Sequence, residues 1–321
     1  EERKVDVVGL RRRILVSASP MTFYSLSENC HKKPAWRIYI IITSERTFLM
    51  TDSHSPIGVF DSGIGGLTAV KELVRLMPNE DIIYLGDTAR VPYGTKSRET
   101  IRKYARQDFD FLLRFGVKMI IAACGTVSST VGDGVLNTGD GVLYTGVIRP
   151  AVNAAVGSTK NGKIGIIGTS ATIRSGSYKN LIKSVMPQAG VFEKACPMFV
   201  PLVENGYIGL DCRPCVDIAR EYLEPLKQAG VDTLVLGCTH YPMLADVIAS
   251  IMGDNVKLIS SGGEAGRTAY NMLRESGLAN DSRNKGKTTL YCTDSVELFR
   301  ENAEHFLYDL ENIEIKSATL D

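Results

Sequence analysis

The sequence has no excess of charge of either sign, which limits the partners it can have. Its 37 Lys and Arg residues are balanced by 36 Asp and Glu residues, so the formal net charge is +1 at pH 7. No basic run is long enough to neutralise a track of phosphates or to hold an anionic membrane surface. We therefore expect no nucleic-acid partner.

Long apolar runs are also absent from the sequence. Stretches such as 38–42 and 119–123 are far shorter than the roughly 20 residues that a membrane-spanning helix requires. We expect no membrane span. A chain of 321 residues, 44% of them hydrophobic, can instead bury more than one globular core, which predicts two domains.

The cysteines do not have the pattern of a disulfide framework. They are odd in number and thinly spread, at positions 30, 124, 196, 212, 215, 238 and 292. This usage favours a reducing cytoplasm, in which thiols stay free for chemistry.

The first 55 residues differ in character from the rest. The arginines at 11–13 followed by Ile-Leu-Val resemble the start of a signal peptide, but Ser17, Ser19 and Pro20 cut the apolar region short. Met50 stands just before the first well-formed strand and is a candidate start. We interpret 1–55 as an N-terminal extension that is poorly ordered or non-native.

From residue 56, short β-rich runs alternate with amphipathic stretches of helical period. This alternation predicts an α/β fold with largely parallel sheets flanked by helices. One helix is indicated up to Pro78, and another over 97–114, with its arginines and Asp108 mostly away from the core. The predicted strands lie at 57–60, 82–86, 118–123, 142–147, 163–168, 233–236, 257–260 and 288–292.

The strands fall into two series that divide near Arg149-Pro150. The second series opens with the strand at 163–168, and no low-complexity linker separates the two. We therefore expect two tightly apposed lobes with a ligand site in the cleft between them.

Two cysteines occupy equivalent places in the two series. Cys124 follows the apolar run at 118–123, Cys238 follows the one at 233–236, and each has a Thr within two residues. Ligands of open α/β sheets bind at these carboxyl ends. A single such cysteine is often only a buried core residue, but a matched pair favours a functional interpretation.

Two opposed thiols suit the inversion of a stereocentre. One thiolate removes the Cα proton from one face and the other thiol returns a proton from the opposite face, which a group with an ordinary pKa near about 8.5 can do after modest tuning. The loop from Asp61 to Gly66 offers backbone N–H groups and the Ser62 hydroxyl to a carboxylate. The alternative is an ordinary βα turn; it is no dinucleotide fingerprint, because Thr68 takes the third glycine position.

Several segments together make the chain resemble the cofactor-independent aspartate/glutamate racemase family over about residues 56–315. The last segment is the most diagnostic and is typical of glutamate racemases. The segments are GVFDSGIGGLT at 58–68, YLGDTARVPYG at 84–94, IAACGT at 121–126, GTSAT at 168–172, SGSY at 175–178, CPMFVPLVE at 196–204 and GCTHYP at 237–242.

The resemblance implies interconversion of L- and D-glutamate, with the D-glutamate used for the cell-wall peptide, and needs no metal, pyridoxal phosphate or nucleotide. It implies Cys124 as the base toward the D-enantiomer and Cys238 toward the L-enantiomer. Asp61 would support the first thiol, and Glu204 with His240 the second. The residues implied to contact substrate are Asp61, Ser62, Tyr93, Gly94, Gly125, Thr126, Thr239 and His240.

The resemblance also implies two pseudo-symmetric lobes and a possible homodimer. The first lobe would comprise 56–148 and 258–321, and the second 149–257. Rival hypotheses are a related two-thiol enzyme acting on aspartate, a hydantoin or maleate, and a non-catalytic relative that binds a metabolite or a protein partner.

Three features depart from the family pattern or compete with it. Gly125 stands where the family usually has Asn, so a substrate-binding amide is missing. Ser260-Ser261 stands where an Asp is common, which bears mainly on local capping. The Cys212-Arg-Pro-Cys215 motif resembles a redox or zinc half-site, but no second half-site accompanies it, and we interpret it as the start of a helix running toward Leu226.

Overall fold

The computed structural model describes residues 51–132, 141–307 and 313–320, together with four short strands before them. Two antiparallel pairs form among these short strands, β1 (Arg3–Val5) with β2 (Ile14–Val16) and β3 (Ile40–Thr43) with β4 (Arg46–Leu49). The remainder of the predicted extension up to residue 50 lies outside the described residues. By its internal contacts the chain divides into the units Glu1–Asp52 and Ser53–Asp321.

The larger unit contains a six-stranded sheet whose paired strands are all parallel. Its order is β14-β13-β6-β5-β7-β8. The strands are β5 (Ile57–Asp61), β6 (Ile82–Gly86), β7 (Met119–Ala122), β8 (Leu143–Gly146), β13 (Thr288–Cys292) and β14 (Ile313–Ser317).

A second, four-stranded parallel sheet has the order β10-β9-β11-β12. Its strands are β9 (Lys163–Gly168), β10 (Gly190–Ala195), β11 (Thr233–Leu236) and β12 (Lys257–Ser260). The order repeats that of β6-β5-β7-β8, since in both sheets the second strand lies on one side of the first and the third and fourth lie on the other. This repeat confirms the predicted α/β fold with two pseudo-symmetric parallel sheets.

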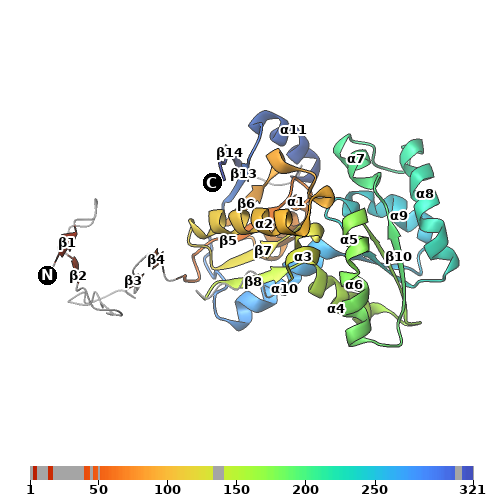
Figure 1. Ribbon diagram of the computed structural model, residues 1–321, viewed down its shortest axis with the longest axis horizontal. Coiled ribbons are helices and arrows are strands. Elements are labelled where there is room, and N and C mark those ends of the chain that lie inside the picture. Colours follow the sequence, from red (N-terminus) through yellow and green to blue (C-terminus); the bar gives the residue numbers. More distant parts are fainter. Residues whose placement is uncertain are drawn as a thin grey trace. The chain divides into compact units, whose positions relative to one another are not determined.

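Helices cover both sheets (Figure 1). Apolar residues of α2 and α3 pack on one face of the six-stranded sheet, and those of α1, α10 and α11 belong to the core on the other face. The helices of this lobe are α1 (Leu67–Leu76), α2 (Arg98–Leu113), α3 (Gly125–Val131), α10 (Ser261–Glu275) and α11 (Val296–Leu307), with the 3-10 turns η1 (Thr88–Arg90) and η2 (Tyr93–Thr95).

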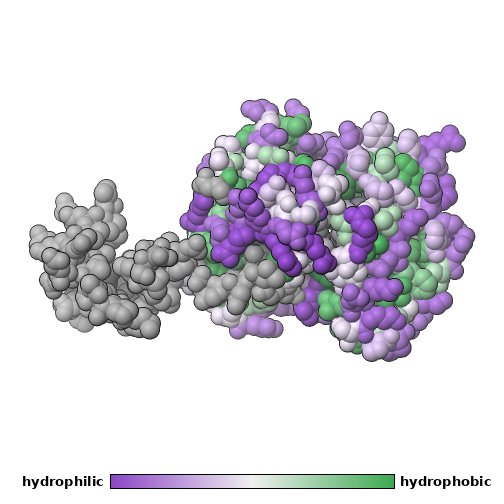
Figure 2. All heavy atoms as spheres, in the orientation of Figure 1, coloured by the Kyte–Doolittle hydropathy of each residue, from purple (hydrophilic) through white to green (hydrophobic). Residues whose placement is uncertain are grey.

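The helices around the four-stranded sheet are shorter on average. They are α4 (Ile148–Ser158), α5 (Ser170–Ser175), α6 (Ser177–Val185), α7 (Phe199–Glu204), α8 (Arg213–Gln228) and α9 (Ala245–Met252), with the 3-10 turn η3 (Tyr241–Leu244). None of the helices in the described part of the chain is both long and apolar enough to cross a membrane. Figure 2 shows hydrophilic and hydrophobic residues interspersed on the viewed face.

One hydrophobic core runs through both lobes. It joins Val59 and Leu73 of the first sheet and its helix α1, Val152 of α4, Val235 of β11 and Ala269 of α10. Burial of this continuous apolar surface opposes separation of the two sheets.

Two strands of the larger unit were not predicted, and each lies at the edge of its sheet. β10 has only half-buried residues, and β14 is half-buried to exposed, so neither carries the apolar run or the alternation that marks a strand in the sequence. The expectation that Asp108 of α2 lies away from the core was also wrong. Its side chain is fully buried because it bonds with Tyr93 and Arg90.

A buried ion pair closes the amino-terminal end of the six-stranded sheet. The ammonium of Lys118 contacts the Glu80 carboxylate, and their side chains are 0% and 2% exposed. Lys118 also donates to the Ser53 carbonyl at 2.7 Å, while Glu80 accepts from the Asn280 backbone N–H at 2.8 Å. These contacts link Lys118, just before β7, to Ser53 earlier in the chain and, through Glu80, to Asn280 later in it.

Replacing Lys118 with methionine is expected to lower the free energy of unfolding by about 3–5 kcal/mol, because it leaves the Glu80 carboxylate buried without its counter-charge. Urea unfolding followed by circular dichroism measures the change. The exposed Lys103, changed in the same way, is the control. Adding Glu80→Gln to the Lys118 variant should recover much of the loss, and no recovery would mean that the lysine acts through packing alone.

Candidate active site

The two cysteines singled out by the sequence lie at the topological switch points of the two sheets. Cys124 comes two residues after β7, next to the end of β5, and Cys238 comes two residues after β11, next to the end of β9. The strand order reverses direction between β5 and β7 and again between β9 and β11. Crevices for ligands form at such points in open parallel sheets.

In the first lobe, Cys124 faces the loop that follows β5. Its Sγ donates to Ser62 Oγ at 3.4 Å. Asp61 shapes the loop, since its Oδ2 accepts from the backbone N–H groups of Gly63 at 3.3 Å and Gly66 at 3.0 Å. Burial, and next the negative charge of Asp61, raise the pKa of the Cys124 thiol to about 12. The resting thiol is therefore protonated.

In the second lobe, Cys238, His240 and Glu204 form a chain of polar contacts. Cys238 Sγ lies 3.9 Å from His240 Nδ1, and His240 Nε2 lies 3.0 Å from Glu204 Oε1. The Glu204 side chain is 44% exposed and the His240 side chain only 8%. Burial disfavours the imidazolium, but its hydrogen bonds with Cys238 and Glu204 outweigh that cost and raise the pKa of His240 to about 10.

The raised pKa of His240 leads to a prediction about pH. A group whose pKa is higher in the folded chain than its usual value near about 6.5 stabilises the fold most below that usual value. This contribution is lost as the pH rises through about 10. Glu204→Gln removes a negative charge beside the ring, so it should lower the pKa of His240 and move the loss of stability to lower pH.

NMR titration of ¹³C-labelled histidine measures this shift directly, because the chain has four histidines and single His→Gln variants assign the signals. His305 serves as the reference. A His240 pKa at or below 6.5 in the unliganded protein would contradict the predicted charge network.

The two halves of the site approach each other closely at two glycines. A Cβ on Gly65 would come within 2.4 Å of both His240 Nδ1 and Thr239 Oγ1, and a Cβ on Gly125 would come within 2.7 Å of the Gly237 carbonyl. Only glycine allows approaches this close. The residues that directly adjoin the two thiols, Gly125 and Gly237, are thus in contact across the lobes.

Thr68 is a contact that the sequence analysis missed. Its hydroxyl donates to the Thr239 carbonyl at 3.1 Å and to the Gly65 carbonyl at 2.9 Å, which links α1 to the loop of Cys238. The available signal was that a threonine stands where a dinucleotide loop would have glycine. Thr126 and Thr239, which were predicted to contact substrate, are buried beside the two cysteines.

Tyr93 lies near the site, but its hydroxyl group bonds with two buried carboxylates. It contacts the carboxylates of Asp87 and, at 3.0 Å, Asp108, and Arg90 binds both carboxylates. Burial and the nearby charge of Asp87 raise the pKa of Asp108 well above its usual range. The phenol is therefore a fixed part of a buried network.

Gly94 follows Tyr93 in the same turn and faces the second lobe. A Cβ there would lie 3.7 Å from Ala171 Cβ of α5. Elsewhere, Ser260 accepts from the Gly263 N–H at 3.2 Å and caps α10 where the family commonly has Asp. Cys212 is the N-cap of α8, which confirms the predicted helix start.

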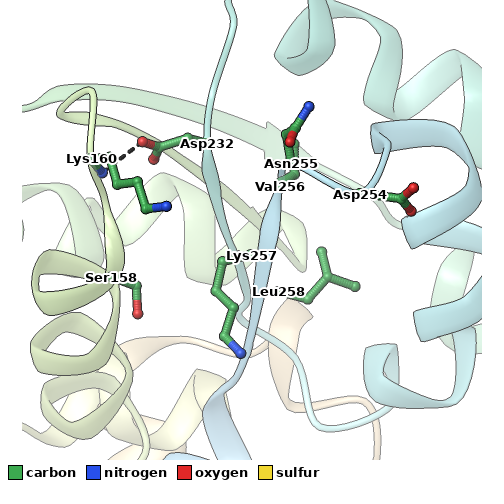
Figure 3. A pocket seen from close by; sticks show the side chains of 8 residues that line it. All are labelled: Ser158, Lys160, Asp232, Asp254, Asn255, Val256, Lys257 and Leu258. Atoms are coloured by element: carbon green, nitrogen blue, oxygen red, sulfur yellow. Dashed lines mark hydrogen bonds between the residues drawn. The ribbon is translucent and has the colours of Figure 1, made fainter.

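A pocket of about 550 Å³ opens at the opposite edge of the four-stranded sheet (Figure 3). It lies at the amino ends of β11 and β12, where Asp232 is held by the backbone N–H groups of Lys160 and Asn161, both at 2.7 Å. Cys238 follows the carboxyl end of β11, so the pocket lies at the other end of that strand. Within the described residues, no His, Cys, Asp and Glu side chains gather as a group of three or more that could hold a metal ion.

The fold and site define a two-lobed α/β protein with a cysteine at the equivalent strand end of each lobe. Comparison with known proteins gives the family. The family described as Asp/Glu/Hydantoin racemase matches residues 57–267. A glutamate racemase of Chlorobaculum tepidum is 46% identical over 264 residues, which cover 82% of this chain and 96% of that protein. The chain therefore belongs to the Asp/Glu/hydantoin racemase family.

Solved structures agree with this assignment. The glutamate racemase isoform RacE1 of Bacillus anthracis superimposes with a TM-score of 0.78 at 36% identity, covering 84% of this chain and 98% of its own. The glutamate racemase of Francisella tularensis, solved in complex with D-glutamate, gives a TM-score of 0.76 at 39% identity, covering 84% of this chain and 99% of its own.

Proposed function

We propose that this protein is a glutamate racemase that interconverts L- and D-glutamate through Cys124 and Cys238. The observation that carries the proposal is the placement of these thiols at equivalent strand ends of two facing lobes, with Gly125 in contact with Gly237. The substrate follows from the relatives, several of which are glutamate racemases at 42–48% identity.

In the proposed mechanism, the Cys238 thiolate removes the Cα proton of L-glutamate while the protonated Cys124 thiol returns a proton to the opposite face. The protonated state of Cys124 suits it as the acid of this direction. The His240 imidazolium, held by Glu204, stabilises the thiolate at 3.9 Å. In the reverse direction the two thiols exchange roles.

The carbanion that forms at Cα needs stabilisation, because the Cα–H bond is far less acidic than a thiol. Backbone N–H groups at the start of α3 and the hydroxyls of Ser62, Thr126 and Thr239 would bind and polarise the substrate carboxylates. The buried setting of both cysteines, 4% and 8% exposed, excludes water and strengthens these interactions. The backbone of Tyr93, Gly94 and Gly125 completes the proposed contacts. Asp61 holds the loop beside Cys124.

Further assignments accompany this proposal. The lobes would comprise 56–148 with 258–321, and 149–257. The protein would act without a cofactor in the cytoplasm, with the D-glutamate entering peptidoglycan. A homodimer is the proposed assembly.

The decisive experiment incubates the purified chain with L-glutamate in D₂O without added cofactor. Optical rotation and the α-proton NMR signal should both decay, because each inversion installs a solvent deuteron. L-aspartate, run in parallel, tests the substrate. Loss of signal with aspartate but not glutamate would reassign the substrate, and inertness toward both would favour a non-catalytic relative.

A further inference from the structure

A second pair of cysteines, outside the proposed active site, opens helix α8. Cys212 is the N-cap residue, Arg213 and Pro214 begin the helix, and Cys215 stands at its third position. Both thiols are free. Neither residue takes part in the proposed racemisation.

The helix sets the spacing of the two cysteines. The Val216 N–H donates to the Cys212 carbonyl at 3.0 Å and closes the first turn. A rise of about 1.5 Å per residue and a radius of about 2.3 Å then place the two Cα atoms about 5 Å apart. This lies within the range of about 4.4–6.8 Å found for disulfides.

The two thiols differ in exposure. Cys212 is partly exposed, whereas Cys215 is fully buried in the core of the second lobe. Burial, and next the negative charge of a Cys212 thiolate, raise the pKa of the Cys215 thiol. A reagent in solution therefore meets Cys212 first, and Cys215 is reached only through it.

We propose that Cys212 and Cys215 form a thiol–disulfide exchange site for low-molecular-weight disulfides. The Cys212 thiolate attacks one sulfur of R–S–S–R, which forms a mixed disulfide and releases one R–S⁻. Cys215 then loses its proton and attacks the Cys212 sulfur, which forms the intramolecular disulfide and releases the second R–S⁻. Two electrons and two protons pass from the cysteine pair to the reagent, which leaves as two R–SH.

The test incubates the reduced, folded full-length chain with glutathione disulfide, followed by alkylation of remaining thiols and mass spectrometry of tryptic peptides. The fragment 195–220 carries both cysteines together with Cys196. We expect it to lose two hydrogens, with the bond located between Cys212 and Cys215 and with Cys196 still alkylated. Dithiothreitol should restore the original mass.

Two single variants separate the roles of the thiols. Cys215→Ser should accumulate a stable mixed disulfide of Cys212 with glutathione, because no second thiol resolves it. Cys212→Ser should react with glutathione disulfide at about one tenth of the wild-type rate or more slowly still, since its remaining thiol is buried. Equal modification of the two variants, or a wild-type pair that stays fully reduced while the denatured chain reacts, would overturn the proposal. Circular dichroism verifies that each variant is folded.

Discussion

Replacing either Cys124 or Cys238 with serine is expected to stop racemisation of glutamate almost completely, with a fall in kcat/KM of at least about 10²–10⁴-fold. A hydroxyl is a much weaker acid than a thiol, so serine cannot hold the anionic form that removes the Cα proton. The change in volume is small at both buried positions, so the fold should persist.

The direction of residual exchange distinguishes the two thiols. In D₂O, Cys124→Ser retains the base proposed for L-glutamate, so any deuterium should enter L-glutamate without inversion. Cys238→Ser should show the opposite preference and exchange only D-glutamate. The asymmetry arises because each thiol addresses one face of Cα.

Cys212→Ser is the matched control for this experiment, because it removes a thiol from the same chain outside the proposed site. It should racemise glutamate at the wild-type rate. If Cys124→Ser or Cys238→Ser retained wild-type racemisation, the two-thiol mechanism would be wrong. If both variants lost activity but exchanged both enantiomers equally, the assignment of one thiol to each face would be wrong.

The second large effect is expected at Gly125, where even an alanine should lower kcat/KM by about tenfold or more. A Cβ at this position would lie 2.7 Å from the backbone carbonyl of Gly237, and both residues adjoin a thiol. The loops must move apart to accept it, which moves Cys124 relative to Cys238. A displacement approaching 1 Å in reacting groups costs on the order of 10²-fold in rate.

Gly125→Asn tests the same contact against the pattern of the family, which usually has asparagine there. The same Cβ should make this variant slower than wild type as well. Gly157→Ala is the control, because a Cβ there meets nothing within 4 Å and Gly157 lies in helix α4. A Gly125→Asn variant faster than wild type would show that the missing amide, and not the lobe contact, limits turnover.

The strands of the sheet interiors could be predicted because their residues are buried on both faces. The interior strands β6, β9, β11 and β13 have the predicted bounds, and so does the edge strand β12. The edge strands β10 and β14 were not predicted, since their half-buried to exposed residues show neither an apolar run nor a regular alternation of polar and apolar side chains. Asp108 was misplaced for a related reason. A carboxylate in an amphipathic helix is expected to face solvent. Asp108 is instead buried against Tyr93 of η2 and Arg90 of η1, which precede its helix.

The site itself could be predicted only in part from the sequence. The matched positions of Cys124 and Cys238 pointed to it because parallel strands align their carboxyl ends. The contact of Gly65 with His240 and the bond from Thr68 to Thr239 cross between lobes, and no local pattern encodes them.

The sequence by itself determined the α/β class, the two strand series and the place of each cysteine, because hydrophobic periodicity and strand order are local properties written along the chain. Only the tertiary structure decided how the two halves meet. Three features depend on distances between separate segments. A Cβ at Gly125 would strike Gly237, Tyr93 is bound in a buried network, and His240 lies between Cys238 and Glu204. Packing of the shared core fixes those distances, and no spacing in the sequence specifies them.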